Sequence, residues 1–168
     1  YVKTGATTRR YLGTIRGSGA NVTEDSLAKR FVWNAYNRVE RNLYTYDAVA
    51  SWSYATTTFR SANNNTSNRV QVVVGLALSR INVRAKVMIN PASAGYAGIC
   101  EDCTNNATAS SDGMYGLSAS NGKTLYIEGN ISKIPAVGYH YYQWTEYSSG
   151  ISVFQAGAEA GVFGSIES

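Results

Sequence analysis

VQVVVGLALSRINVRAKVMI, residues 70–89, is the stretch of sequence that decides the fold. A strict alternation marks its second half, where apolar Ile81, Val83, Ala85, Val87 and Ile89 are separated by Asn82, Arg84, Lys86 and Met88. A period of two places the apolar side chains on one face of a β-strand and the others on the opposite face. The first half repeats the pattern with Val70, Val72, Val74 and Leu76. The stretch therefore predicts two half-buried strands, with residues 75–80 available to turn the chain between them.

More strands are expected on either side, each bounded by turn-forming residues. Pro91 and Gly95 stop the second strand, and runs of Asn, Ser and Gly separate the segments that follow. The segments expected to be strands are 9–16, 43–48, 51–60, 125–128, 137–147, 151–155 and 161–167. Many short strands with such separators predict an all-β fold, an antiparallel β-sandwich of jelly-roll-like type. With 168 residues, we expect one domain over residues 9–168, preceded by the end of a stalk or linker at residues 1–8.

One segment, residues 26–38, fits either a helix or a strand. Asn21 and Glu24 have the spacing of a capping box, and Leu27 with Phe31 have the spacing of a helical pair. However, the apolar residues Phe31, Trp33 and Ala35 also alternate with Val32, Asn34 and Tyr36, which is the period of a strand. We expect a strand over residues 30–37, preceded by a single helical turn.

Composition excludes several classes of protein. Charged residues make up 15% and aromatic residues 12% of the chain, which contains thirteen Tyr and sixteen Gly. Disordered chains have many charges and few rings, whereas turn-rich β domains and recognition surfaces have this composition. The net charge of +4 comes from scattered basic residues, which argues against nucleic-acid binding. The longest apolar run, residues 72–78, is far below the ~20 residues that span a bilayer, so no membrane insertion is expected.

The two cysteines, Cys100 and Cys103, allow three interpretations. A redox pair belongs at a helix start near a βαβ unit, which the sequence does not contain. A zinc site needs four ligands, and the single histidine, His140, is distant in sequence. A local disulfide or two free thiols is the expected state, and no metal or other cofactor is expected.

Catalytic residues are not identifiable from the sequence. A hydrolytic triad needs a base held against a nucleophile, and His140 lies in an aromatic strand, on the face of Tyr142 and Trp144. Two acids suffice for glycoside cleavage, but no two carboxylates are paired by their positions. We therefore expect a protein that is not an enzyme.

A second stretch, residues 5–38, carries a resemblance to a known family. It contains Gly5, Arg9 with Arg10, Leu12, Gly13 and Arg16, then Asp25-Ser26, Lys29-Arg30-Phe31 and Asn37-Arg38. In these residues the chain resembles a C-terminal domain of tailed-bacteriophage virion proteins, found at the ends of tail or head fibres and other appendages. The resemblance covers about the first quarter of the chain and implies an assembly role in the virion, among other virion proteins, as a homotrimer.

Two features of the sequence favour self-association independently. Unblunted edge strands call for a cover, and Tyr139 and Tyr141 are expected on the opposite face of their strand from Tyr142 and Trp144. The loops of residues 60–69, 92–116 and 118–123 are expected to contact a host surface glycan or protein. The candidate contact residues are Asn63, Asn64, Asn65, Tyr96, Met114 and Tyr115. Two alternatives remain, a fibre-tip enzyme that degrades polysaccharide and a small capsid or decoration jelly roll.

Overall fold

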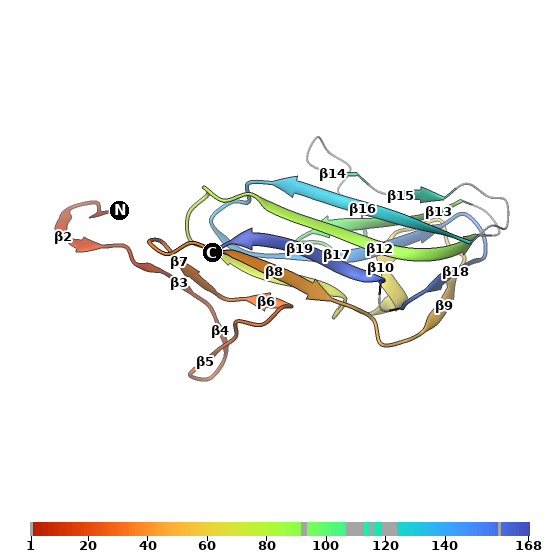
Figure 1. Ribbon diagram of the computed structural model, residues 1–168, viewed down its shortest axis with the longest axis horizontal. Coiled ribbons are helices and arrows are strands. Elements are labelled where there is room, and N and C mark those ends of the chain that lie inside the picture. The colour runs from red at the N-terminus through yellow and green to blue at the C-terminus, as the bar shows by residue number, and fades with distance from the viewer. Residues whose placement is uncertain (1, 92–93, 107–112, 115, 119–123, 158) are drawn as a thin grey trace.

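The chain forms a two-layered β-sandwich in the computed structural model shown in Figure 1. The structure describes residues 2–91, 94–106, 113–114, 116–118, 124–157 and 159–168. Nearly all strand pairs are antiparallel, as the sequence predicts. The prediction of an all-β sandwich is therefore confirmed.

The first sheet is built around β12 (Ile81–Pro91), which pairs along one side with β16 (Leu125–Lys133). Along its other side, β12 pairs first with β19 (Gly161–Glu167) and then with β18 (Ser152–Gln155). Outside these lie β8 (Glu40–Thr45), paired with β19, and β9 (Ser51–Tyr54), paired with β18. A two-residue strand, β14 (Gly113–Met114), is added to β16.

The second sheet is built around β17 (Gly138–Ser148), which pairs along one side with β13 (Gly95–Glu101). β15 (Gly116–Ser118) continues the sheet beyond β13. On the other side of β17 lie β10 (Arg60–Ser61) and β11 (Arg69–Val74). The 3-10 turn η1 (Ala62–Asn64) interrupts them, and β6 (Lys29–Arg30) pairs in parallel with β11.

The strand order is that of a jelly roll. β10 and β11 both lie along β17, and β18 and β19 both lie along β12, so each pair acts as one interrupted strand. β8 and β9, which lie along β19 and β18, form a third interrupted strand. Numbered along the chain, the main strands then have the order 1-8-3-6 in the first sheet and 2-7-4-5 in the second. Apart from the fourth and fifth strands, which are neighbours in the second sheet, consecutive strands cross between layers, as in the double-sheet jelly rolls of capsid and lectin domains.

The core lies between the two sheets. Ile81, Val83, Ala85, Val87 and Ile89 are all buried, whereas Asn82 and Arg84 are exposed. From the other sheet, Val70, Val72 and Val74 pack against them together with Tyr142 and Trp144. Trp52 contacts Trp144 edge-on, with ring centroids 5.6 Å apart, and stacks on Phe154 at 6.0 Å. The alternation of residues 81–89 is therefore the inward face of β12, as predicted.

Some element bounds differ from those predicted. The segment 51–60 is not one strand, because β9 ends at Tyr54 and β10 begins at Arg60. Residues 26–28 form a bend instead of the expected helical turn. The strand expected over residues 30–37 is shorter, since β7 (Val32–Asn34) ends where the Asn34 side chain accepts hydrogen bonds from the backbone N–H groups of Tyr36 and Asn37, at 2.9 and 3.2 Å. An Asn side chain that binds the backbone ahead of it favours a turn.

The amino-terminal part of the chain extends from one end of the sandwich as an arm, at the end where the carboxy terminus also lies (Figure 1). β1 (Val2–Lys3) pairs with β2 (Ala6–Arg10), and β4 (Gly17–Gly19) pairs with β5 (Val22–Thr23). Between them, β3 (Gly13–Ile15) pairs with β7. Residues 2–23 join neither main sheet. We call residues 2–23 the arm, and the end of the sandwich from which they extend the arm-side end.

Candidate assembly surface

Residues 24–31 cover the edges of both sheets at once. The N–H of Tyr44 in β8 donates to the carbonyl of Leu27, and the N–H of Gln71 in β11 donates to the carbonyl of Ala28, each at 2.8 Å. The Arg30 guanidinium adds a 2.8 Å hydrogen bond to the carbonyl of Asn42 in β8. Two N–H groups and one carbonyl that these edges would otherwise expose are thus satisfied within the chain.

Ion pairs fix this cover in place. Asp25 accepts from Arg30 at 3.2 Å and from Arg41 at 3.0 Å, while Lys29 pairs with Glu24 at 2.9 Å. The hydrogen bonds from Lys29 and Ser26 lower the pKa of Glu24. These pairs are partly exposed, and each contributes little on its own. Together these ion pairs connect the turn at Glu24 and Asp25 to the basic residues Lys29 and Arg30.

A second attachment joins the arm to the end of β11. The Trp33 ring in β7 is only 1% exposed, and Tyr11 stacks beside it with centroids 6.0 Å apart. Gly75, the residue that follows β11, lies against both rings, so closely that a β-carbon there would collide with them. At Gly13, likewise, a β-carbon would meet the backbone of Trp33. Only glycine fits at these two positions without a shift, because neighbouring atoms approach the backbone too closely for a β-carbon.

The second aromatic face of β17 is covered by the chain itself. Tyr139 lies under the Arg16 guanidinium, 3.3 Å from the ring centroid, and contacts Phe31 edge-on at 6.1 Å. Arg69 lies over Tyr141 at 4.7 Å. The alternation predicted for this strand is present, because His140 and Tyr142 oppose the core residues Val72 and Val70 in β11. Within one chain, residues 24–31 and these two arginines thus cover part of the strand edges and part of the aromatic face from which the sequence favours self-association.

Exposed apolar side chains gather at the arm-side end instead. The Ala35 N–H donates to the Leu12 carbonyl at 2.8 Å, and Arg38 donates to Ser79 at 2.9 Å, so the arm exit, the β7–β8 connection and the β11–β12 connection adjoin. The β16–β17 connection turns at the same end of the sheets. The large apolar residues exposed on these segments are Leu12, Tyr36, Val39, Leu78, Ile134 and Val137, of which Leu12 is 70% and Val137 61% exposed. Exposed apolar side chains on adjoining segments are a feature of many interaction sites.

The predicted contact residues in the Asn-rich loop lie mostly inward. The side-chain amides of Asn63, Asn65 and Asn68 donate to the buried carboxylate of Asp47, at 3.2, 3.3 and 2.5 Å. Burial alone would raise the pKa of Asp47, but the hydrogen bonds from Asn68, the Val49 N–H and the other two amides outweigh it and lower the pKa. Asn64 is the exposed residue of the predicted three.

Of the other predicted contact residues, Tyr96 is half-buried, at right angles to Tyr147 with centroids 5.0 Å apart and near Phe59 at 6.4 Å. Tyr115 and the side chain of Met114 lie outside the described part of the chain. The structure therefore does not bring the predicted contact residues together in one described patch.

A second buried carboxylate holds the turn between β10 and β11. Glu146 in β17 is fully buried and accepts hydrogen bonds from the Trp52 indole at 2.5 Å, Arg60 at 2.8 Å and the Asn63 N–H at 3.1 Å. Burial raises the pKa of Glu146 above its ordinary value, although the Trp52 and Arg60 donors oppose that rise. Asp47 and Glu146 are thus both occupied in fixing the loop geometry.

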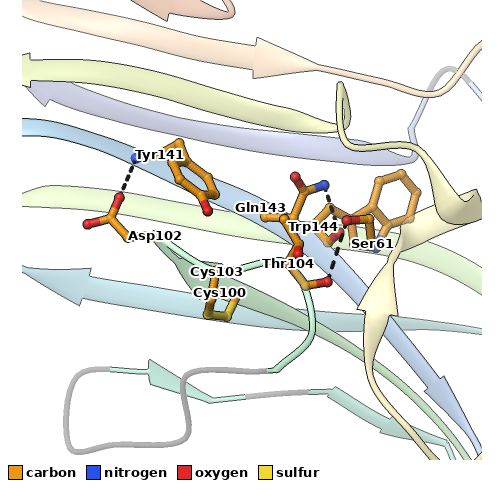
Figure 2. The surroundings of a disulfide bond; sticks show 8 residues. All are labelled: Ser61, Cys100, Asp102, Cys103, Thr104, Tyr141, Gln143 and Trp144. Carbon is orange, nitrogen blue, oxygen red and sulfur yellow. Dashed lines mark hydrogen bonds between the residues drawn. A yellow bond between two sulfur atoms is a disulfide. The ribbon is translucent and has the colours of Figure 1, made fainter.

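The cysteines form a disulfide at the end of β13, with Cα atoms 5.3 Å apart. Figure 2 shows this bridge beside β17. The Asp102 carboxylate accepts from the Tyr141 N–H at 2.9 Å, and Ser61 donates to the Thr104 carbonyl at 3.4 Å (Figure 2). Of the three interpretations, the structure adopts the local disulfide, which fixes the chain after β13 against β17.

His140 has both ring nitrogens hydrogen-bonded. Nδ1 lies 2.7 Å from the Asp102 carboxylate, and Nε2 lies 3.0 Å from the Ala136 carbonyl. A general base must direct a free ring nitrogen at the proton it takes, so this arrangement connects two loops. Across the described residues, no group of three His, Cys, Asp or Glu side chains is placed to bind a metal.

Comparison with known proteins adds no relative: no family model matches the sequence, and no curated protein matches it. Nor does any described segment form a helix with the length and apolar character needed to cross a bilayer.

Proposed function

We propose that this chain is a structural protein of a bacteriophage virion, the C-terminal domain of a tail fibre, a head fibre or a related appendage. The observation that carries the proposal is the arm-side end, where a docked arm and six exposed apolar side chains meet. The residues that carry the family resemblance fall in the arm and its attachments, through Gly13, Arg16 and Asp25-Ser26 among others. That placement supports an assembly role rather than catalysis.

In the proposed particle the domain is a homotrimer joined at its arm-side end. An isolated two-stranded hairpin is at best marginally stable in water. Among the described strands β4 and β5 pair with each other alone, and Val22 is 59% exposed. Neighbouring copies would supply the missing packing for the arm and for Leu12 and Val137. Closed symmetric assembly of this kind hides apolar surface without open-ended growth.

Joining at this end directs the opposite end of the sandwich outward. That end contains the β17–β18 connection with exposed Ile151, and the half-buried ring of Tyr96 at the start of β13. We propose that this end faces the host cell in the virion, in the extracellular particle. It extends the expectation that loops held on a rigid sheet make the contact with a surface glycan or protein.

Light scattering tests the assembly. The purified chain should have three times the 18.2 kDa mass of one copy, and Val137→Asp should reduce that mass to one copy because it places a charge in the apolar contact. Ile151→Asp is the matched control, since Ile151 is similarly exposed, at 64%, but lies at the opposite end. A native chain that stays monomeric at micromolar concentration would overturn the trimer.

Labelling of particles tests the location. An antibody raised against the domain should decorate an appendage of phage particles in electron micrographs, and antibody absorbed with the pure domain should not. Particles that contain no such antigen by labelling and by mass spectrometry would refute the virion assignment.

A further inference from the structure

Two neighbouring hollows lie on the outer face of the first sheet, and a third adjoins them where the chain leaves β8 and β18. The first, of about 540 Å³, crosses β8, β19, β12 and β16. The second, of about 430 Å³, shares Asn42 and Phe163 with the first, and the third, of about 450 Å³, shares Tyr44 with the second. They form one extended depression, which we call the sheet groove.

Polar side chains in the groove have hydrogen-bonding capacity that no described residue uses. Strand register places Asn42, Ser165 and Asn82 in one outward row and Arg84 opposite Asn130 in the next. Among the described residues, the side chains of Asn42, Arg84, Asn130 and Ser165 have no hydrogen-bond or ion-pair partner. The groove therefore presents free amides, a hydroxyl and a guanidinium from four adjacent strands.

Aromatic rings continue the groove beyond these polar groups. Phe163 lies beside Tyr44 with centroids 5.1 Å apart, and Tyr44 stacks on Tyr46 at 5.8 Å. Arg84 lies over the far side of Phe163 at 5.7 Å. Tyr46, at the end of this ladder, is 57% exposed. Rings in successive hollows offer apolar platforms with polar hydroxyl ends.

The charge in the groove narrows the class of ligand. The first hollow is lined by one acid, Glu40, and one base, Arg84. A nucleic-acid site concentrates positive charge, which the first hollow does not. A balanced, shallow groove of free amides beside a ladder of rings fits a chain of linked polyhydroxylated rings, because such a ligand has hydroxyls at its edges and apolar C–H faces.

We infer that the sheet groove binds an oligosaccharide. The inference rests on the proposed function only for the source of the sugar, a bacterial envelope polysaccharide. It places glycan recognition on a sheet face formed by β8, β12, β16 and β19, apart from the loops expected from the sequence. Arg84 and Asn130 donate to sugar hydroxyls, and a carboxylate on the sugar would pair with Arg84.

The probe is an array of bacterial capsular polysaccharides, lipopolysaccharide O-chains and teichoic acids, overlaid with the purified chain. At least one polysaccharide should retain it. An oligosaccharide cut from the best-binding polysaccharide, titrated by calorimetry, should bind Arg84→Ala about tenfold or more weakly, as expected for loss of a charged donor. Tyr46→Ala should weaken binding about two- to tenfold.

The matched control for Arg84→Ala is Asn90→Ala. Asn90 is exposed on the outward face of β12, the strand that contains Arg84, but it lies outside the groove. This substitution should change affinity less than twofold, and thermal melting should show that all variants are folded. The inference would be overturned if no polysaccharide retained the chain, or if the chain bound only to a protein. It would also be overturned if Arg84→Ala and the native chain bound the oligosaccharide with equal affinity. Particle labelling is independent of these results, so failure of the groove and failure of the virion assignment are distinguishable.

Discussion

Replacing Gly75 by alanine should loosen the arm from the sandwich. The new β-carbon would lie 2.8 Å from Cδ2 of Trp33 and closer still to another ring atom and to the Tyr11 hydroxyl. Trp33 is 1% exposed and cannot move aside without displacing its neighbours. The backbone of Gly75 is in an ordinary conformation, so the cost arises from the collision alone. Overpacking of this kind costs about 1–3 kcal/mol of unfolding free energy.

The magnitude translates into a measurable change. For a chain of this length, about 1–3 kcal/mol corresponds to a fall in Tm of roughly 2–12 °C. If the collision is instead relieved by release of the arm, the Tm falls less, but the amide protons of β3 and β7 lose protection. Calorimetry together with hydrogen exchange read by mass spectrometry distinguishes these two outcomes, and both agree with the packing argument.

Gly19→Ala is the matched control, because a β-carbon at Gly19 meets no atom within 4 Å. It should leave both the Tm and the exchange pattern unchanged to within ordinary error. If Gly75→Ala melts like the native chain and keeps β3 and β7 protected, then Trp33 is not packed as described and the arm attachment is wrong.

Three further changes probe the buried polar groups and the disulfide. Asp47→Asn should cost about 1–3 kcal/mol at pH 7, because a buried acceptor of several hydrogen bonds is lost. Since the folded pKa of Asp47 is lowered, its contribution to the free energy of unfolding is present above the ordinary value of 3.8 and is lost as pH falls through the lower folded value. Urea unfolding at pH 7, 5 and 3 should show the stability difference between Asp47→Asn and the native chain shrinking in acid. A difference that stays constant with pH would contradict this. Arg60→Ala should cost about 3–5 kcal/mol at pH 7 by leaving Glu146 buried and unpaired. Because the folded pKa of Glu146 is raised, its protonated form is favoured in the fold, so this cost should shrink as pH falls towards 4; a cost independent of pH would show that Glu146 is not charged. Cys100→Ser with Cys103→Ser should lower stability by about 2 kcal/mol, the expected entropy of so short a loop, and reductant should shift the Tm of the native chain but not that of the double variant.

The strands of the core could be predicted from the sequence because their side chains obey a local rule. The alternation over residues 81–89 is visible without any partner strand, and burial of Ile81 through Ile89 on one face follows it. The interruption between β9 and β10 could not be seen, because Trp52 and Arg60 both reach the distant Glu146. Local propensity does not include a partner about ninety residues further along the chain.

Similar distances explain why the polar residues were harder to place. Asn63 and Asn65 have the composition of a solvent-facing loop, yet Asp47 draws their amides inward. Edge exposure was expected from the small number of charges, whereas residues 24–31 satisfy the edges of β8 and β11 through backbone groups. Backbone hydrogen bonding of this kind leaves no trace in side-chain pattern.

The sheet groove was not predicted, for a different reason. Asn42, Arg84 and Asn130 belong to three strands and lie more than forty residues apart in sequence. Each alone has the character of an ordinary exposed strand residue. Only the jelly-roll order, with β19 between β8 and β12, brings these side chains onto one outer face.

The cover formed by residues 24–31 has a consequence for how such domains can be exchanged between proteins. A recombination point placed after residue 31 would transfer the rest of both sheets without the segment that bonds to each of them, through the carbonyls of Leu27 and Ala28 and the Arg30 guanidinium. The recipient protein would then expose unpaired edges of β8 and β11, and it would tend to polymerise through these edges. Chimeras that fold should therefore have their recombination points before Glu24. Residues 24–31 and the two sheets should be inherited together.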